Sequence, residues 1–437
     1  MIFKSTRGGG AAVSFKSAVF EGLASDGGLY HPTSIPNLNK LFLSLTSSSD
    51  YNQIAEEVTF HLLSPEIDRE TARRIVSASY DFSPHLQRID DSLFVLELFH
   101  GPSYAFKDFG ACFLASCMEE FLSGDKRDAV ILVATSGDTG SAVARAFLGK
   151  KNIHVVILYP SGRVSMLQEK QLTTLGKNIS TLEVKGSFDD CQKMVKQAFT
   201  DTELNRKLML TSANSINLGR LIPQSFYYIH AYAQLAAELD DGLVFCVPSG
   251  NFGNLTAGVY AWQWGLPVKR FIAATNKNDV VPQYLQSGIY ETRASIRTLS
   301  NAMDVGNPSN MERLRAVFNS DWAKMAAMLQ GEVITDEETT ETIKGVWNRS
   351  ALIIDPHTAV GYLAATRFRN RNDLPGAKIV IIATAHPAKF RETVREATGQ
   401  QPELPAGLQE ALDLPKKSTV VENTLQDLKD FILARFA

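Results

Sequence analysis

Apolar residues follow two patterns along this chain. From about residue 85 onward, short runs of apolar and β-branched residues recur, and most are followed by a glycine turn and a helical stretch. Strands that alternate with helices are typical of parallel sheets, and they favour doubly wound open sheets over a sandwich or a single closed barrel. We expect strands at 93–99, 129–135, 154–159, 180–184, 243–247, 269–274 and 378–384.

The N-terminal part has helical periodicity instead. Apolar residues recur at helical spacing in Tyr51–Leu63 and again in 65–80, and a Ser/Asp run at 47–50 is suited to capping a helix. We therefore expect a mostly helical lobe at 1–90, a smaller α/β domain at 91–230 and a larger α/β domain at 231–437. An amphipathic helix is expected to end the chain at 422–436.

The loop Ser249-Gly250-Asn251-Phe252-Gly253-Asn254 lies between an expected strand and an expected helix. Two glycines let backbone N–H groups point at a ligand, and the positive end of a helix dipole favours a phosphate. The alternative is an ordinary turn. Neither the P-loop nor the dinucleotide-binding fingerprint occurs in the sequence, which argues against a nucleotide-dependent enzyme.

A second loop of the same kind, Thr135-Ser136-Gly137-Asp138-Thr139-Gly140-Ser141, is rich in hydroxyls. Its backbone N–H groups and hydroxyls are suited to holding a carboxylate or a phosphate. The alternative is a capping cluster, in which Asp138 or Ser141 satisfies the first helical turn.

Lys107 lies among aromatic residues ahead of an apolar helix. Desolvation would lower its pKa and make the neutral amine available for Schiff-base chemistry. The alternative is a lysine that reaches solvent from a helix start and pairs with Asp108. At the end of the last expected strand, the Thr384 hydroxyl is suited to hydrogen-bonding a ligand's ring nitrogen, whereas His386 is interpreted as structural.

Composition narrows the class of protein further. The 437 residues carry 44 Lys+Arg and 47 Asp+Glu, a net charge of −3, which argues against binding to nucleic acid. The four cysteines lack metal-site spacing, so we expect no metal and a reducing compartment. No apolar stretch approaches the roughly 20 residues that span a bilayer, and the start lacks a signal peptide's apolar core. We expect a cytoplasmic protein with no membrane or nucleic-acid partner.

The motifs, taken together and in order, resemble a known family. They are similar to pyridoxal-phosphate enzymes of fold type II, the tryptophan synthase β and serine dehydratase group, and within it to the threonine synthase branch with an extra N-terminal lobe. The resemblance covers nearly the whole chain and rests on residues 4–8, 14–15, 26–30, 100–102, 105–108, 136–140, 212–217, 250–254 and 383–387.

The resemblance implies a role for each matching residue. Lys107 would bind pyridoxal phosphate covalently and shuttle protons, and Thr384 would hydrogen-bond the pyridine nitrogen. The segment Gly250, Asn251, Phe252, Gly253 and Asn254 would cradle the cofactor phosphate. The substrate carboxylate would be held by the loop of Ser136, Gly137, Asp138 and Thr139. Asp138, where many relatives have Asn, would lie near the cofactor's 3′-oxygen.

The implied reaction converts O-phospho-L-homoserine and water to L-threonine and phosphate, which is carbon–oxygen lyase chemistry and the last step of threonine biosynthesis. Arg163, with Lys170 and Arg220 behind it, is our candidate for binding the substrate phosphate, because arginine suits bidentate contacts; a solvated surface arginine is the alternative.

One rival function is that of a related lyase or dehydratase that gives 2-oxobutyrate from phosphohomoserine, serine or threonine. A second is a non-catalytic protein on the same scaffold. We expect a monomer or a homodimer.

Overall fold

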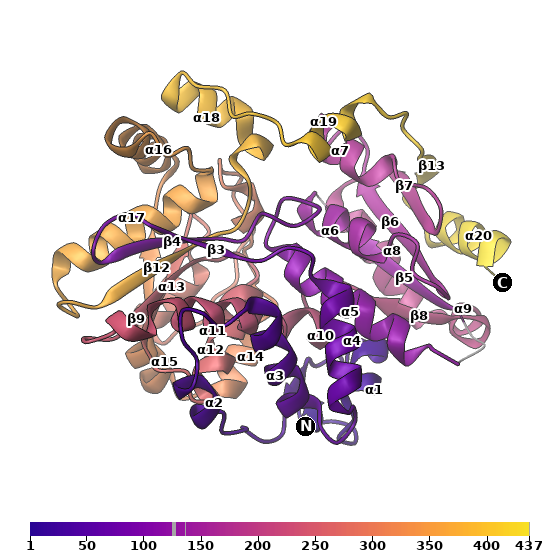
Figure 1. Cartoon of the computed structure of the whole chain (residues 1–437). Helices are drawn as coiled ribbons and strands as arrows, with labels where there is room; N and C mark the ends of the chain where they lie inside the picture. The colour runs from indigo at the N-terminus through magenta and orange to yellow at the C-terminus, as the bar shows by residue number, and fades with distance from the viewer. Residues whose placement is uncertain (125–127, 136, 437) are drawn as a thin grey trace.

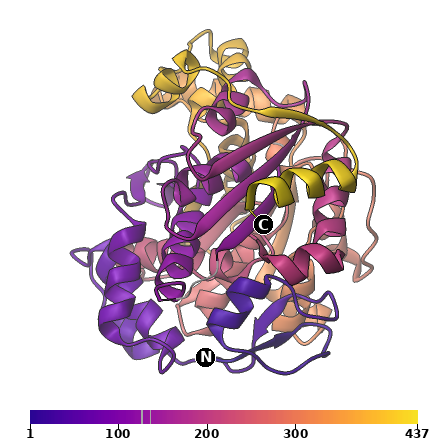
Figure 2. The ribbon, with the colours of Figure 1, turned by 90° about the vertical axis from the view of Figure 1, so that its right-hand side faces the viewer.

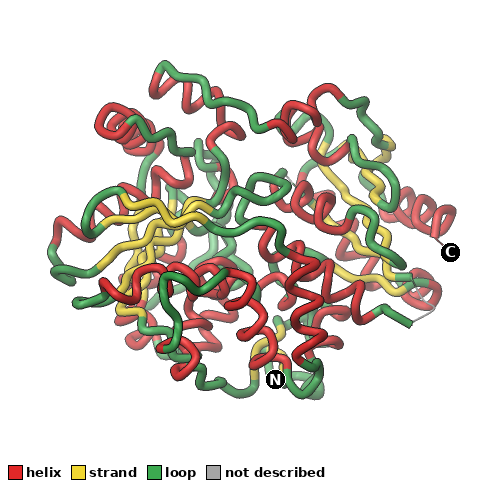
Figure 3. The backbone as a smooth tube through the Cα atoms, in the orientation of Figure 1, coloured by secondary structure: helices red, strands yellow, loops and turns green. Residues whose placement is uncertain are grey.

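Two open sheets and an N-terminal lobe make up the computed structural model, which describes residues 1–124, 128–135 and 137–436. The sheets lie on opposite sides of the molecule in Figure 1, with the N-terminal helices below the space between them. Figure 3 shows the strands gathered in these two groups, with helices around both. The predicted α/β class with two largely parallel open sheets is confirmed.

The larger sheet has six strands in the order β11-β10-β9-β12-β4-β3. All neighbours are parallel except β3, which is antiparallel to β4. The central strands are runs of apolar residues with both faces covered, as parallel strands require. The six strands are β3 (His85–Arg88), β4 (Leu93–Glu97), β9 (Leu243–Pro248), β10 (Val268–Thr275), β11 (Leu329–Val333) and β12 (Lys378–Ala383).

The smaller sheet has five strands in the order β13-β7-β6-β5-β8, and all its neighbours are parallel. All six residues of β5 are buried, so this strand lies between two covered faces. The strands are β5 (Ala129–Ala134), β6 (Ile153–Pro160), β7 (Ile179–Lys185), β8 (Met209–Ser212) and β13 (Thr419–Glu422).

Sheet membership does not follow the chain order of the expected domains. Strand β4 precedes every strand of the smaller sheet in the chain but pairs in the larger one, next to β12. Conversely, β13, near the C-terminus, pairs with β7 at the edge of the smaller sheet. The chain therefore crosses between the two sheets more often than a simple division at 90 and 230 implies.

Helices cover the faces of both sheets. Around the smaller sheet lie α5 (Lys107–Phe121), α6 (Asp138–Phe147), α7 (Met166–Thr173), α8 (Phe188–Thr200), α9 (Thr202–Lys207) and α10 (Leu218–Leu221). Around the larger sheet lie α11 (Gln224–Leu235), α12 (Gly253–Gln263), α13 (Val280–Ser287), α14 (Met311–Val317), α15 (Trp322–Met328), α16 (Asp336–Ser350) and α17 (Pro356–Arg371). The described part of the chain also contains the short 3-10 helices η1 (Ala236–Glu238), η2 (Asn301–Met303) and η3 (Pro387–Phe390).

The N-terminal lobe is helical as expected but also contains a small sheet. Its helices are α1 (Phe15–Glu21), α2 (Asn39–Leu43), α3 (Tyr51–Leu63) and α4 (Arg69–Ser79), and strands β1 (Phe3–Ser5) and β2 (Tyr30–Pro32) pair antiparallel. Asp50 caps α3, as the Ser/Asp run predicted. Buried Arg313 of α14 ties the lobe to the larger sheet's helices, because its Nε donates to the Tyr30 carbonyl at 2.9 Å.

The last part of the chain returns from the larger sheet to the smaller one. It passes over the top of the molecule in Figure 1 through α18 (Arg391–Thr398) and α19 (Ala406–Asp413) and continues into β13 and α20 (Leu425–Phe436). Figure 2 shows α20 lying across the outside of the smaller sheet. Its Leu428 and Ile432 are fully buried there, so this terminal helix covers an apolar face. The predicted C-terminal helix is confirmed and begins at Leu425.

One close contact between helices positions the site. Gly110 of α5 lies so near α10 that an added Cβ would come within 2.5 Å of the Arg220 carbonyl oxygen. A larger residue would push the two helices apart. The first turn of α5, which carries Lys107, is thereby held against the segment that carries Arg220.

Candidate active site

Lys107 is the first residue of α5, so the prediction of an amine at a helix entrance is confirmed. The loop that leads to it is bound to the segment after β12: Phe106 donates its backbone N–H to the Thr384 carbonyl at 2.8 Å, and Ala105 forms an isolated antiparallel bridge with Ala385. Because β4 and β12 are parallel neighbours, the loops that follow them lie side by side at the carboxyl ends of the strands of the larger sheet. The structure therefore brings Lys107 and Thr384 together.

The Lys107 side chain is 17% exposed, and its nearest carboxylate is that of Asp138. The distance from Lys107 Nζ to Asp138 Oδ2 is 3.8 Å, and the Asp138 side chain is only 6% exposed. Asp108, the partner in the alternative interpretation, instead accepts a hydrogen bond from the Ser103 backbone at 2.9 Å. Burial lowers the pKa of Lys107, and nearby Lys389 and Arg220 lower it further, while Asp138 opposes them. Such an amine loses its proton more readily than a solvated lysine.

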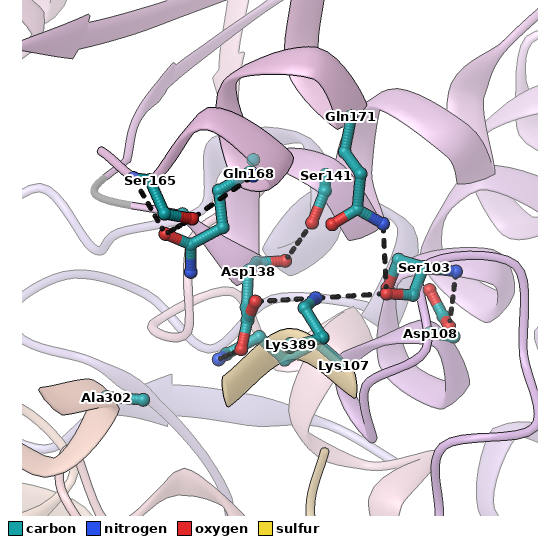
Figure 4. A network of polar contacts seen from close by, with 12 residues as sticks. Ser103, Lys107, Asp108, Asp138, Ser141, Ser165, Gln168, Gln171, Ala302 and Lys389 are labelled. Carbon is teal, nitrogen blue, oxygen red and sulfur yellow. Dashed lines mark hydrogen bonds and ion pairs between the residues drawn. The ribbon is translucent and has the colours of Figure 1, made fainter. Parts of the chain in front are cut away.

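A second lysine, which sequence reasoning missed, lies on the other side of Asp138 (Figure 4). Lys389 of η3 places its Nζ 2.6 Å from Asp138 Oδ1 and 3.0 Å from the Ser103 carbonyl oxygen. Burial raises the pKa of Asp138, but Lys389 and Lys107 together hold it well below its usual range. The only sequence signal was the position of Lys389 just after the Ala383–Pro387 motif, and a lone lysine there resembles a surface residue.

The hydroxyl-rich loop turns tightly between β5 and α6. The Thr135 hydroxyl accepts hydrogen bonds from the backbone N–H groups of Gly137 at 3.0 Å and Gly140 at 2.9 Å. An added Cβ on Gly137, whose φ is +152°, would lie 2.5 Å from Gln168. Gly137 is the N-cap of α6, with no side-chain capping bond, and Asp138 faces Lys107 instead. The capping interpretation of Asp138 is therefore wrong.

The remaining residues predicted for this loop differ in exposure. Thr139 is partly exposed in the first turn of α6, so it is accessible to a small ligand. Ser136, also predicted to contact the substrate carboxylate, lies outside the described residues.

The glycine-asparagine loop follows β9 and leads into α12, which begins at Gly253. Phe252 adopts a left-handed conformation with φ 59°, which turns the chain sharply before the helix. An added Cβ on Gly250 would lie 2.8 Å from both the Ala302 carbonyl oxygen and Met303 Cα, so a second segment closely covers this loop. The carbonyl of Asn251 accepts from the Asn310 backbone at 3.2 Å, which fixes the loop from that side.

Asn254 supplies a donor that nothing in the described part of the chain satisfies. Its Oδ1 accepts hydrogen bonds of 2.6 Å from the hydroxyls of Tyr227 and Tyr228, whereas its buried Nδ2 has no partner there. A buried donor without a partner is costly, and an acceptor such as a phosphate oxygen would satisfy it.

The three cations proposed for the substrate phosphate lie in different surroundings. Arg163 is exposed in the turn after β6. Lys170 donates its amine to the Leu414 carbonyl at 2.6 Å, so it is already engaged. Arg220 is 2% exposed and donates to the Ala213 carbonyl at 2.7 Å, while its Nε has no partner among the residues that the structure describes. Burial lowers the pKa of Arg220 to about 10.

A family model described as "Pyridoxal-phosphate dependent enzyme" matches residues 82–385, more than half of the chain. The chain therefore belongs to the pyridoxal-phosphate-dependent enzymes. Two further models, "Threonine synthase N terminus" and "Threonine synthase, C-terminal", match residues 2–80 and 358–432. Within the pyridoxal-phosphate-dependent enzymes, the chain belongs to the threonine synthase family.

Individual relatives agree with this assignment. The chain is 42% identical over 426 residues to threonine synthase of Haemophilus influenzae, covering 96% of this chain and 97% of the relative. It is 44% identical over 403 residues to that of Escherichia coli, with 92% of each chain covered. The crystal structure of a PLP-bound threonine synthase from Brucella melitensis superposes with a TM-score of 0.92 at 36% identity, covering 100% of this chain and 99% of that one.

These findings confirm the predicted family, fold type and cofactor, and they favour threonine synthase over the predicted 2-oxobutyrate-forming lyase. The described residues also fit pyridoxal phosphate. Lys107 offers an amine with a lowered pKa for the cofactor aldehyde, and Asn254 an unsatisfied donor for its phosphate. Among the described residues, no helix is long and apolar enough to cross a membrane.

Proposed function

We propose that this chain catalyses the conversion of O-phospho-L-homoserine and water to L-threonine and phosphate with pyridoxal phosphate. The observation that carries the proposal is the partly buried Lys107 amine, which lies 3.8 Å from Asp138 and follows a loop whose backbone is bonded to Thr384. A site with an activated amine, an ionised carboxylate and a glycine loop before a helix is suited to this chemistry.

The residues that would hold the cofactor come from four segments. Lys107 would bind its aldehyde carbon, and the Thr384 hydroxyl its pyridine nitrogen. The loop from Gly250 through Asn254 would hold the phosphate with backbone N–H groups and the free Asn254 amide. Asp138 would lie near the 3′-oxygen. When bound, pyridoxal phosphate supplies an aldehyde that links covalently to amines and a conjugated ring that accepts electrons from the substrate.

The chain's own residues would bind and orient the substrate and move its protons. The Lys107 Nζ would take the substrate's α-proton and return protons later, because burial makes its neutral form accessible. The backbone of Gly137, with Thr139 and Ser136, would hold the substrate carboxylate at the start of α6. Arg163 would bind the phosphate group that leaves. The Thr384 hydroxyl carries no charge, so it would not enforce a protonated pyridine ring as a carboxylate would.

Product analysis tests the proposed function. The full chain, loaded with pyridoxal phosphate and given O-phospho-L-homoserine, is expected to release threonine and phosphate in equal amounts. Formation of 2-oxobutyrate and ammonia would assign the chain to the lyase class instead. The Lys107→Ala variant is the control, since it should form neither set of products.

We also propose that the protein acts in the cytoplasm on this small-molecule substrate, as a monomer or homodimer and without a nucleic-acid partner. A nearly balanced charge, 44 basic against 47 acidic residues, supports the absence of a nucleic-acid partner. We also propose domain boundaries near residues 90 and 230, with β4 and β13 as strands that each pair in the sheet of the other domain. Light scattering of the loaded protein would give its oligomeric state, and a mass above that of a dimer would contradict the proposal.

A further inference from the structure

The side chain of Lys389 is basic and buried. Its side chain is 0% exposed, and its ammonium lies 2.6 Å from Asp138 Oδ1 and 3.0 Å from the Ser103 carbonyl oxygen. Removing a lysine from water is costly unless charged and polar partners replace the water. Lys389 has a charged partner, the Asp138 carboxylate, and a polar partner, the Ser103 carbonyl. These contacts stabilise its charged form in the interior.

Asp138 lies between two amines, as Figure 4 shows. Its Oδ1 faces Lys389 at 2.6 Å, and its Oδ2 faces Lys107 at the longer distance of 3.8 Å. A carboxylate this close to an amine favours the protonated form of the amine. Without Lys389, the carboxylate would be left with Lys107 as its ion-pair partner among the described side chains, and it would hold a proton on that amine.

We propose that Lys389 is a positioning residue, which binds and neutralises the Asp138 carboxylate so that the Lys107 amine loses its proton more readily than it would beside an unpaired carboxylate. This inference rests on the proposed role of Lys107 and extends it by naming what keeps the amine reactive. Lys389 itself acts on the site through Asp138 and has no assigned contact with the substrate.

The other charged and titratable groups around these residues are consistent with this role. Asp108 favours the protonated form of Lys107, but it lies in the same helix and is engaged by Ser103. Arg220 on α10 disfavours that form, and His357 on α17 stabilises the charged form of Asp138. Lys389 on η3 is the group in direct contact with the carboxylate.

The test measures how the reactivity of Lys107 depends on pH in the full-length, cofactor-free chain. Trace labelling with acetic anhydride across a pH series, followed by mass spectrometry of the peptide that contains Lys107, gives the pH midpoint of its amine. Lys389→Gln removes the charge but retains a hydrogen-bond donor, and we expect the midpoint to rise by about one pH unit or more. Lys389→Arg retains the charge and should leave the midpoint near that of the unchanged chain.

The pairing with Asp138 is tested separately. In an Asp138→Asn background, Lys389→Gln should shift the midpoint by less than half as much, because the carboxylate that Lys389 neutralises is gone. Lys150→Gln is the matched control: Lys150 follows the C-terminal end of α6, the opposite end from Asp138, and pairs with Glu119 at 2.8 Å, so its loss should not move the Lys107 midpoint.

An unchanged or lower midpoint in Lys389→Gln would overturn the proposal, as would an equally large shift in the Asp138→Asn background. If Lys389→Gln does not fold, Asp138→Asn alone decides. A small change in the Lys107 midpoint of Asp138→Asn supports neutralisation of Asp138 by Lys389. A fall of that midpoint by about one pH unit or more contradicts it. These midpoints need no cofactor, so a failure of the proposed function, seen as no attachment of pyridoxal phosphate to Lys107, is distinguishable from a failure of this inference.

Discussion

Phe106 and Thr384 are joined by a backbone hydrogen bond of 2.8 Å that lies one residue before Lys107. The two residues are far apart in the sequence but follow adjacent parallel strands, β4 and β12. The bond and the neighbouring Ala105–Ala385 bridge fix the entrance of α5 against the end of β12. A rigid element on each side therefore sets where the Lys107 amine lies relative to the Thr384 hydroxyl.

Replacing Thr384 with Val should lower turnover without preventing cofactor attachment. Valine keeps the branched shape in a position only 7% exposed, but it removes the hydroxyl proposed to bind the ring nitrogen. Loss of one such hydrogen bond, about 1 kcal/mol, corresponds to roughly a fivefold fall in kcat. Steady-state kinetics of Thr384→Val and Thr384→Ser check this. Equal losses in both variants would show that shape, and not the hydroxyl, matters.

Replacing Gly250 with Ala should weaken cofactor binding. The added Cβ would meet the Ala302 carbonyl oxygen and Met303 Cα at 2.8 Å, and backbone atoms on both sides cannot move apart freely. Overpacking of about 1–3 kcal/mol would raise the Kd for pyridoxal phosphate roughly five- to 150-fold. Equilibrium dialysis measures it. Gly345→Ala is the control and should leave the Kd unchanged, because its added Cβ would lie 3.6 Å from the flexible Arg349 side chain.

Replacing Arg163 with Ala should raise KM for O-phospho-L-homoserine strongly if this exposed arginine binds the substrate phosphate. Loss of a charged contact to a phosphate costs about 1.5–3 kcal/mol, roughly a ten- to hundredfold change. Initial rates over a range of substrate concentrations give KM. Arg73, an exposed arginine of α4, provides the control variant Arg73→Ala. An unchanged KM in Arg163→Ala would remove Arg163 from the site.

Acid should destabilise the fold partly through His230. Burial lowers the pKa of this ring to about 4, and its Nδ1 has no partner among the described residues. The unfolded chain takes up a proton below about pH 6.5, whereas the folded chain resists until about pH 4, so stability is full above this window and falls as pH drops through it. At pH 5 this group should cost up to about 2 kcal/mol relative to pH 7.5.

Urea unfolding of the chain and of His230→Leu at both pH values isolates that contribution. The variant should lose less stability on acidification, because leucine cannot be protonated. An identical loss in both proteins would show that His230 does not contribute to the acid sensitivity.

Seven strands were predicted from the sequence, and all seven lie inside a sheet. They correspond to β4, β5, β6, β7, β9, β10 and β12, whose apolar runs reflect burial on both faces. The strands that were missed at the sheet edges are β3, β8, β11 and β13. Edge strands are short and partly polar because one side has no neighbouring strand, so their sequences lack the continuous apolar run.

The site likewise contains residues that the sequence indicates and one, Lys389, that it does not. Lys107, Asp138 and Asn254 lie in glycine- or hydroxyl-rich segments at the ends of strands, where sequence patterns carry information about ligands. Lys389 lacks such a context, and its role depends on a contact with Asp138 that only the folded chain creates. The small N-terminal sheet was missed for the same reason, since β1 and β2 are three residues each and are defined by their pairing.

Reduction with borohydride tests most directly whether Lys107 carries the cofactor. The full chain loaded with pyridoxal phosphate should be yellow, lose that absorption on reduction, and yield one modified peptide, which contains Lys107. Lys150→Ala should behave identically, whereas Lys107→Ala should show neither the modification nor turnover of O-phospho-L-homoserine. A colourless loaded protein, a modification on another lysine, or full turnover in Lys107→Ala would contradict the assignment.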